Sequence, residues 1–135
     1  MLNRLTESLN FQSQALVLRA ERQRLIASNI ANADTPGYQG REIDFAAALR
    51  EATGGGATRA ALATTHASHA APAAAATAET RLLYTTPAQP SLDGNSVDMD
   101  RERASFVDNA VKYEATLRFI NGSVRTMLDA IKGGQ

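Results

Sequence analysis

Apolar side chains recur at alternating steps of four and three residues near the end of the chain. The series comprises Phe106, Ala110, Tyr113, Leu117, Ile120, Val124, Met127 and Ile131. This spacing is typical of a long helix that packs along a partner helix in a coiled coil. Asp98 and Asp100 precede the series, where acidic residues favour a helix N-terminus. Gly133 follows Lys132 as a stop signal, so the pattern predicts a helix over residues 98–132.

A second amphipathic pattern occupies the start of the chain. Two neighbouring stripes of apolar residues follow helical steps, with Leu2, Leu5, Leu9, Leu16, Ala20 and Ala27 in one, Phe11, Ala15, Leu18 and Leu25 in the other, and Ile26 and Ile30 extending the surface. The charged residues expected on the solvent side are Arg19, Glu21, Arg22 and Arg24. This helix should end near residues 32–35, because Pro36 disfavours helical geometry at the residue before it.

Residues 36–97 differ in kind from both ends. A short helix is predicted from Asp44 to Ala52, with Asp44 as its N-cap. Three glycines follow at 54–56, and residues 58–80 are mostly Ala and Thr, with few side chains that could anchor a core. We expect a weakly ordered insert in which neighbours induce strand or helix segments. Because alanine favours helix, a helical turn over residues 73–78 remains open.

These zones predict a mainly α fold, in which residues 1–35 and 98–132 form one antiparallel, coiled-coil-like pair and residues 36–97 form a turn, a short helix and the insert. The first helix is expected to contribute Leu9, Leu16, Leu18, Leu25 and Ile26 to packing against the C-terminal series. Two helices leave flanking residues such as Val107, Val111 and Leu128 exposed, which favours lateral packing with other chains. A self-contained helical hairpin is the alternative.

Charge and composition narrow the class of partner. Fourteen Lys and Arg residues balance fourteen Asp and Glu residues, so no global field attracts nucleic acid or an anionic membrane. The absence of cysteine excludes disulfides and thiolate metal sites. Neither the apolar run of a cleavable signal peptide nor a membrane span of roughly 18 apolar residues is visible. We therefore expect a cytoplasmic protein, or one exported by a route that reads no such signal.

Candidate catalytic and metal sites are sparse. His66 and His69 could share a helical face, but no nearby carboxylate completes a metal site. A triad of His66, Ser68 and Glu79 lacks the Gly-x-Ser-x-Gly turn of a hydrolase. A calcium-loop pattern beginning at Asp93 fails because its twelfth residue is not Glu, so a turn leading into a capped helix is the better account. We expect no enzyme activity, cofactor, metal or small-molecule substrate.

Polar residues gather where the first helix should end. Their side chains can bond the carbonyl groups left free at a helix end or reach an adjacent element. Proline followed by glycine makes a tight exit, and the tyrosine after it can pack back on the helix end. The residues of this motif are Ser28, Asn29, Asn32, Thr35, Pro36, Gly37 and Tyr38.

The motif resembles the signature of the axial proteins of the bacterial flagellum, the family of the rod and hook. In that family the first helix ends in Ser-x-x-x-Asn-x-x-Thr-x-Gly-Tyr, which Ser28, Asn32, Thr35, Gly37 and Tyr38 fill. The segments that look like the proximal-rod members in particular are residues 9–12, 19–23, 41–45 and 94–102. The resemblance covers both ends of the chain and none of the Ala/Thr-rich insert.

The resemblance implies a structural subunit of the basal-body rod in the periplasm. Its implied partners are copies of itself, other flagellar rod proteins, and the membrane-ring adaptor protein and export gate at the rod base. The implied route is the flagellar type III system, without a cleaved signal peptide. Assembly would be helical around an export channel and would transmit torque. The alternative from another class is a soluble coiled-coil adaptor or export chaperone, which the helical periodicity fits but the motif does not predict.

Overall fold

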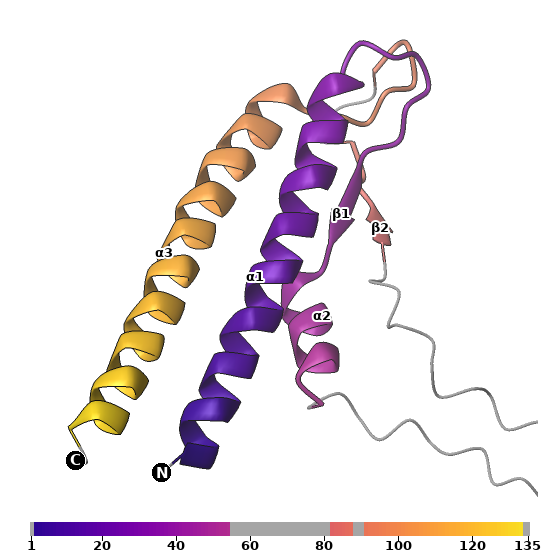
Figure 1. Cartoon of the computed structure of the whole chain (residues 1–135). Coiled ribbons are helices and arrows are strands. Elements are labelled where there is room, and N and C mark those ends of the chain that lie inside the picture. Colours follow the sequence, from indigo (N-terminus) through magenta and orange to yellow (C-terminus); the bar gives the residue numbers. More distant parts are fainter. Residues whose placement is uncertain (1, 55–81, 88–90, 134–135) are drawn as a thin grey trace, which may run out of the picture.

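A computed structural model describes residues 2–54, 82–87 and 91–133 of the chain (Figure 1). The elements in chain order are α1 (Leu2–Ala31), β1 (Arg41–Ile43), α2 (Phe45–Ala52), β2 (Leu82–Tyr84) and α3 (Met99–Lys132). The sequence-based suggestions for His66, Ser68, His69 and Glu79, and for a helical turn over residues 73–78, lie outside the described residues.

The two long helices α1 and α3 lie side by side and run in opposite directions (Figure 1). Both ends of the chain therefore lie at the same end of the pair. On the other side of α1, α2 and β1 pack against it, whereas α3 packs mainly against α1. The mainly α fold with a pair of long terminal helices is confirmed.

Local signals place the helix boundaries close to their predicted positions. The Asp98 carboxylate caps α3 by accepting hydrogen bonds from the backbone N–H groups of Asp100 and Arg101, at 3.1 and 3.2 Å. The Asp44 carboxylate caps α2 in the same way, accepting from the N–H of Ala47 at 3.0 Å. Because a cap acts within three residues of itself, these boundaries can be read from the sequence.

The strand pair was not predicted. β1 and β2 are antiparallel, with Arg41 opposite Tyr84 and Ile43 opposite Leu82. Each strand has three residues, which is too short to show the alternation that identifies a strand. Their pairing joins segments some 40 positions apart, so no local turn signal announces it.

The expected solvent side of α1 is wrong for two arginines. The Arg19 guanidinium carbon lies 4.4 Å from the centre of the Phe45 ring in α2, and Arg22 forms an ion pair with Glu42 of β1 at 3.0 Å. Both face inward because α2 and β1 cover this side of α1. A helical pattern alone does not show that a second layer will cover a charged stripe. Arg24 is exposed as expected.

Candidate functional site

The carbonyl groups at the end of α1 are capped by a side chain from the segment just before α3. Nδ2 of Asn95 donates to the carbonyl oxygens of Asn32, Ala33 and Thr35, at 2.9, 2.8 and 2.9 Å. Oδ1 of Asn95 accepts from the N–H of Val97 at 2.8 Å, which fixes the orientation of the amide. The buried Asn95 thereby holds the segment that leads into α3 against the end of α1.

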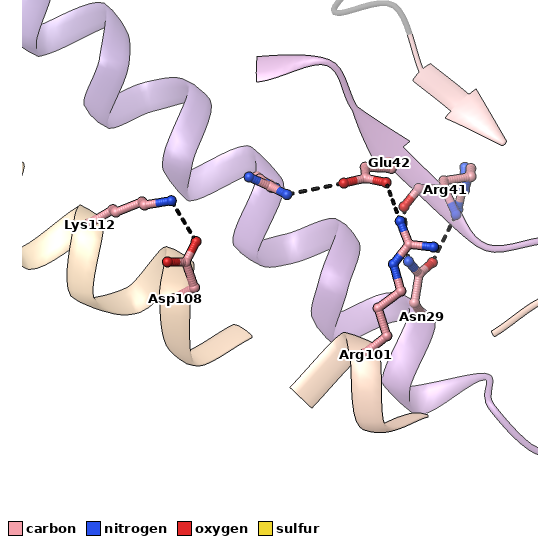
Figure 2. Close-up of polar contacts among 7 residues, drawn as sticks. Asn29, Arg41, Glu42, Arg101, Asp108 and Lys112 are labelled. Carbon is pink, nitrogen blue, oxygen red and sulfur yellow. Dashed lines mark hydrogen bonds and ion pairs between the residues drawn. The ribbon is translucent and has the colours of Figure 1, made fainter. Parts of the chain in front are cut away.

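Asn29, in the last turns of α1, binds the backbone of β1. Its side chain is 1% exposed. Its Nδ2 donates to the carbonyl of Arg41 at 2.9 Å, and its Oδ1 accepts from the Arg41 N–H at 3.0 Å (Figure 2). The Tyr38 hydroxyl also donates to this oxygen at 3.3 Å and lies 3.3 Å from Oγ of Ser28. One amide therefore joins helix, turn and strand.

The remaining motif residues shape the exit turn, which we define as residues 32–40. Nδ2 of Asn32 donates to the Ser28 carbonyl at 2.8 Å, and the Thr35 hydroxyl donates to Oδ1 of Asn32 at 3.3 Å. Gly37 follows the exposed Pro36 with a φ of 72°, a conformation that favours glycine, and its N–H donates to the Asp93 carbonyl at 2.8 Å. Local bonds and a non-local one thus set the path of the turn.

Gly40 closes the exit turn in a space that admits no side chain. Its N–H donates to Oγ of Ser96 at 2.8 Å, and its carbonyl accepts from the Thr85 N–H at 2.9 Å. A Cβ atom at this position would lie 2.5 Å from Oγ1 of Thr85. The exit turn, the residue after β2 and the segment before α3 therefore meet at a single buried glycine.

A charged cluster fastens the start of α3 to α1 and β1. Glu42 of β1 accepts from Arg22 of α1 at 3.0 Å and lies 3.6 Å from Arg101 of α3 (Figure 2). Glu102 is buried beside this network, close to Asn29. Burial raises the pKa of Glu102, and Glu42 raises it further, while Asn29, Arg101 and Arg22 oppose the shift.

Glu102→Gln is expected to stabilise the chain modestly at pH 7, by about 0.5–1 kcal/mol, because glutamine carries no charge into this buried site. Because the pKa of Glu102 is higher in the folded chain than in the unfolded chain, ionisation of this carboxyl destabilises the fold. This destabilisation is fully present above the folded-state pKa and is absent below the unfolded-state pKa. The gain should therefore shrink toward pH 4. Urea unfolding of both chains at pH 7 and pH 4 measures this, and a gain that is equal or larger at pH 4 would contradict it.

The centre of the contact between α3 and α1 is polar. The buried residues of α3 are Glu102, Asn109 and Thr116, spaced seven apart. Asn109 donates through Nδ2 to the Arg19 carbonyl at 2.9 Å and to Oε1 of Gln23 at 2.6 Å. Oγ1 of Thr116 donates to the Lys112 carbonyl of its own helix at 2.8 Å. The most deeply buried line of α3 thus differs from the apolar series recognised in the sequence.

The structure places the apolar packing candidates around this polar line. Leu18 and Ile26 of α1 are buried, and the half-buried candidates are Leu9, Leu16, Leu25, Ala110, Tyr113, Leu117, Ile120 and Met127. Phe106, Val124 and Ile131 are exposed. The structure thus brings the α1 candidates and the middle of the α3 series to the helix pair and leaves the rest of the series facing outward.

Sequence reasoning missed four residues that organise the site, namely Gly40, Asn95, Ser96 and Asn109. The first three act between segments far apart in the chain, so no local pattern marks them. The sequence does contain a pattern that indicates Asn109. Polar residues recur at 102, 109, 116 and 123, in step with the apolar series, and a seven-residue repeat of polar residues marks one line along a helix.

The polar groups of this site hold parts of the chain together. Within residues 2–54, 82–87 and 91–133, no group of three or more acidic or His side chains could hold a metal ion. In that same part of the chain no helix is both long and apolar enough to cross a membrane. The amides, hydroxyls and ion pairs of the site bind other parts of the chain, and what they produce is a fixed turn and a fixed helix pair.

Comparisons with known proteins point to one family. Residues 9–39 match the family model described as flagella basal body rod protein. The flagellar basal body rod protein FlgB of Salmonella typhimurium is 49% identical over 141 residues, which cover 99% of each chain. That of Escherichia coli K12 is 47% identical over 137 residues, again covering 99% of each. That of Cereibacter sphaeroides is 44% identical over 127 residues, covering 94% of this chain and 95% of its own.

Proposed function

We propose that the chain builds the proximal end of the flagellar rod by packing its paired helices side by side with neighbouring subunits. The proposal starts from its family, because the chain belongs to the flagellar basal body rod proteins FlgB. As a member of this family it is a structural subunit of the rod and not an enzyme. The family gives no support to the alternative of a soluble adaptor or export chaperone.

The observation that carries the packing proposal is the outward face of α3. The sides of α3 that α1 leaves uncovered, here together called the outer face, expose large apolar side chains along the whole helix, and these side chains are Phe106, Val107, Val111, Phe119, Val124, Leu128 and Ile131. Val107, Val111 and Ile131 are 62%, 63% and 65% exposed. Monomeric proteins rarely expose so many apolar side chains on a single element, and such surfaces mark contacts with other proteins.

The arrangement of the elements explains why the outer face needs a partner. α1 is covered on one side by α3 and on another by α2 and β1, so several residues of its apolar stripes, such as Leu18 and Ile26, are buried within the chain, whereas Phe11 is exposed. α3 packs mainly against α1, and the line that it buries there is polar. Seven large apolar side chains of α3 are therefore left exposed and available to other subunits, which supports the lateral contacts of a helical tube.

Val111→Asp is expected to abolish assembly while leaving the isolated chain folded. The side chain is mostly exposed, so its charge should change the free energy of unfolding by less than about 0.5 kcal/mol. In a subunit contact the same carboxylate is buried without a partner, which costs several times more. Cells carrying the variant should lose swimming and yield at least about tenfold fewer extractable basal bodies, since 1.4 kcal/mol corresponds to a factor of ten.

Val111→Thr provides the matched control, because threonine has nearly the shape of valine without a charge. It should retain swimming and basal bodies close to the level of the unsubstituted chain. Circular dichroism of both purified variants separates loss of assembly from loss of fold. Normal swimming in the Val111→Asp strain would rule out the outer face as a subunit contact.

The proposal extends to the neighbours of the subunit and to its route of export. We infer that the neighbours are copies of this chain, other rod proteins, and the membrane-ring adaptor and export gate at the rod base, and that assembly surrounds an export channel and transmits torque. We also infer export through the flagellar type III apparatus without cleavage of a signal peptide. Membership of a rod-protein family supports contacts with other rod proteins. A mass spectrum of the subunit from extracted basal bodies tests the route of export, since a mass below that of the 135-residue chain would exclude export without cleavage.

A further inference from the structure

The apolar residues of α3 do not by themselves determine how far α3 slides along α1. Phe106, Tyr113, Ile120 and Met127 are spaced by seven, and so are Ala110, Leu117, Val124 and Ile131. In a slide of one seven-residue repeat, about 10 Å along the axis, every residue of a series except the one at its end moves to the place that another apolar residue of that series occupied. Apolar packing is non-directional, so neighbouring registers differ little in this respect.

The polar residues between the helices do distinguish the registers. Glu102 of α3 lies beside Asn29 of α1, and one repeat further along, Asn109 donates to Oε1 of Gln23 at 2.6 Å and to the Arg19 carbonyl at 2.9 Å. Gln23 in turn donates through Nε2 to the Phe106 carbonyl of α3 at 3.5 Å. From Glu102 to Asn109 the residue number rises by seven along α3, and from Asn29 to Gln23 it falls by six along α1, as expected for two antiparallel helices.

A slid register removes the partner of Asn109. Seven residues from Gln23 on α1 lie Leu16 in one direction and Ile30 in the other, and both are aliphatic. In either alternative the buried Asn109 amide would face a side chain that neither donates nor accepts. A buried amide without a partner is strongly disfavoured, so the polar contact penalises both alternatives.

Stability alone gives no reason for an asparagine at this position. Its side chain is completely buried, and its Oδ1 has no hydrogen-bond partner among the described residues. An apolar side chain of similar size would avoid that unpaired oxygen. We propose that Asn109, through Gln23, is a positioning residue that fixes the register of α3 on α1. A single buried asparagine is known to have this effect in coiled coils.

The register matters for the shape of the subunit. The segment before α3 is tied to the end of α1 by Asn95, while the outer face lies along the rest of α3. A slide of one repeat would move the outer face by about 10 Å relative to α1, α2 and the exit turn. Neighbouring subunits could then no longer make equivalent contacts.

Engineered cysteines can report the register directly, because the natural chain has none. Ala20 and Ala110 line one shallow groove of about 300 Å³ between α1 and α3, so Ala20→Cys with Ala110→Cys reports the observed register. Ser13→Cys or Ala27→Cys with Ala110→Cys reports the two slid registers, because each lies seven residues from Ala20. The measurement is the yield of intramolecular disulfide in the purified full-length chain under mild oxidation.

With Asn109 present, the Ala20 pair should form at least about tenfold more disulfide than either slid pair, a preference equal to about 1.4 kcal/mol. Asn109→Leu should lower this ratio at least about threefold without lowering the urea midpoint, while the bonds of Asn95 continue to favour the observed register. Thr116→Val is the matched control. Its hydroxyl bonds its own helix, so this substitution should leave the ratio unchanged.

The exchange of Gln23→Asn with Asn109→Gln keeps an amide on each helix and should restore most of the preference. Equal yields from all three pairs with Asn109 present, or an unchanged ratio in Asn109→Leu, would overturn the proposal. Because the ratio concerns one chain in solution, it can fail while the assembly role of the outer face still stands.

Discussion

Asn95→Asp is expected to destabilise the folded chain by about 3 kcal/mol. The substitution keeps the size of the side chain and the acceptor for the Val97 N–H, but it removes the amide that donates to three carbonyl oxygens at the end of α1. A carboxylate there would also bring negative charge against those oxygens. The free energy of unfolding, taken from urea denaturation followed by circular dichroism, measures the loss.

The matched control is Asn121→Asp, the same chemical change at an exposed position of α3. It should alter the free energy of unfolding by less than about 0.5 kcal/mol. If both substitutions cost the same, the end of α1 does not depend on Asn95 for its capping. A smaller urea slope for Asn95→Asp alone would show that the end of α1 separates from the segment before α3 before the rest unfolds.

Asn29→Leu is the second substitution with a large expected effect, again about 3 kcal/mol. Leucine is similar in size but leaves the N–H and the carbonyl of Arg41 without the partners that Asn29 provides, and it removes the acceptor of the Tyr38 hydroxyl. Because Asn29 is 1% exposed, water cannot readily replace these bonds. Urea unfolding again gives the free energy.

A double-mutant cycle with Tyr38→Phe tests the cause of that loss. If Tyr38 acts through Asn29, removal of its hydroxyl should cost less in the Asn29→Leu chain than in the native one. Asn10→Leu, at an exposed position of the same helix, should be close to neutral. Strict additivity in the cycle would show that the turn is held by other contacts.

The parts of the fold that were predicted correctly are those that depend on neighbouring residues. The two long helices follow from repeats of apolar residues, and the starts of the short helix α2 and of α3 follow from Asp44 and Asp98, which cap them. Tyr38 packs back on the end of α1, as the compact exit at Pro36 and Gly37 suggested. Each of these inferences needs only a short window of sequence.

The parts that were missed depend on contacts between distant segments. Asn95 binds carbonyl groups about 60 positions away, and β1 pairs with β2 across the insert. The polar centre of the helix pair was missed for another reason. A helical pattern is recognised mainly from its apolar side chains, so it does not indicate that the buried residue of this turn is Asn109 and not Phe106, three residues before it.

The exposed flank of the helix pair was anticipated and is present. Val107, Val111 and Leu128 are all exposed in the single chain. Since two helices cannot bury apolar side chains all around both of their surfaces, this result follows from geometry. It connects the sequence pattern to the rod, because the surface that the chain leaves uncovered is the surface that another subunit can cover.

Labelling of a single cysteine at position 111 tests the central claim most directly, namely that neighbouring subunits cover the outer face in the rod. Val111→Cys introduces one thiol into a chain without cysteine at a site that is 63% exposed in the single chain. A maleimide reagent should label it fully in the purified chain and leave it unlabelled in detergent-extracted basal bodies. Equal labelling in both would contradict the account.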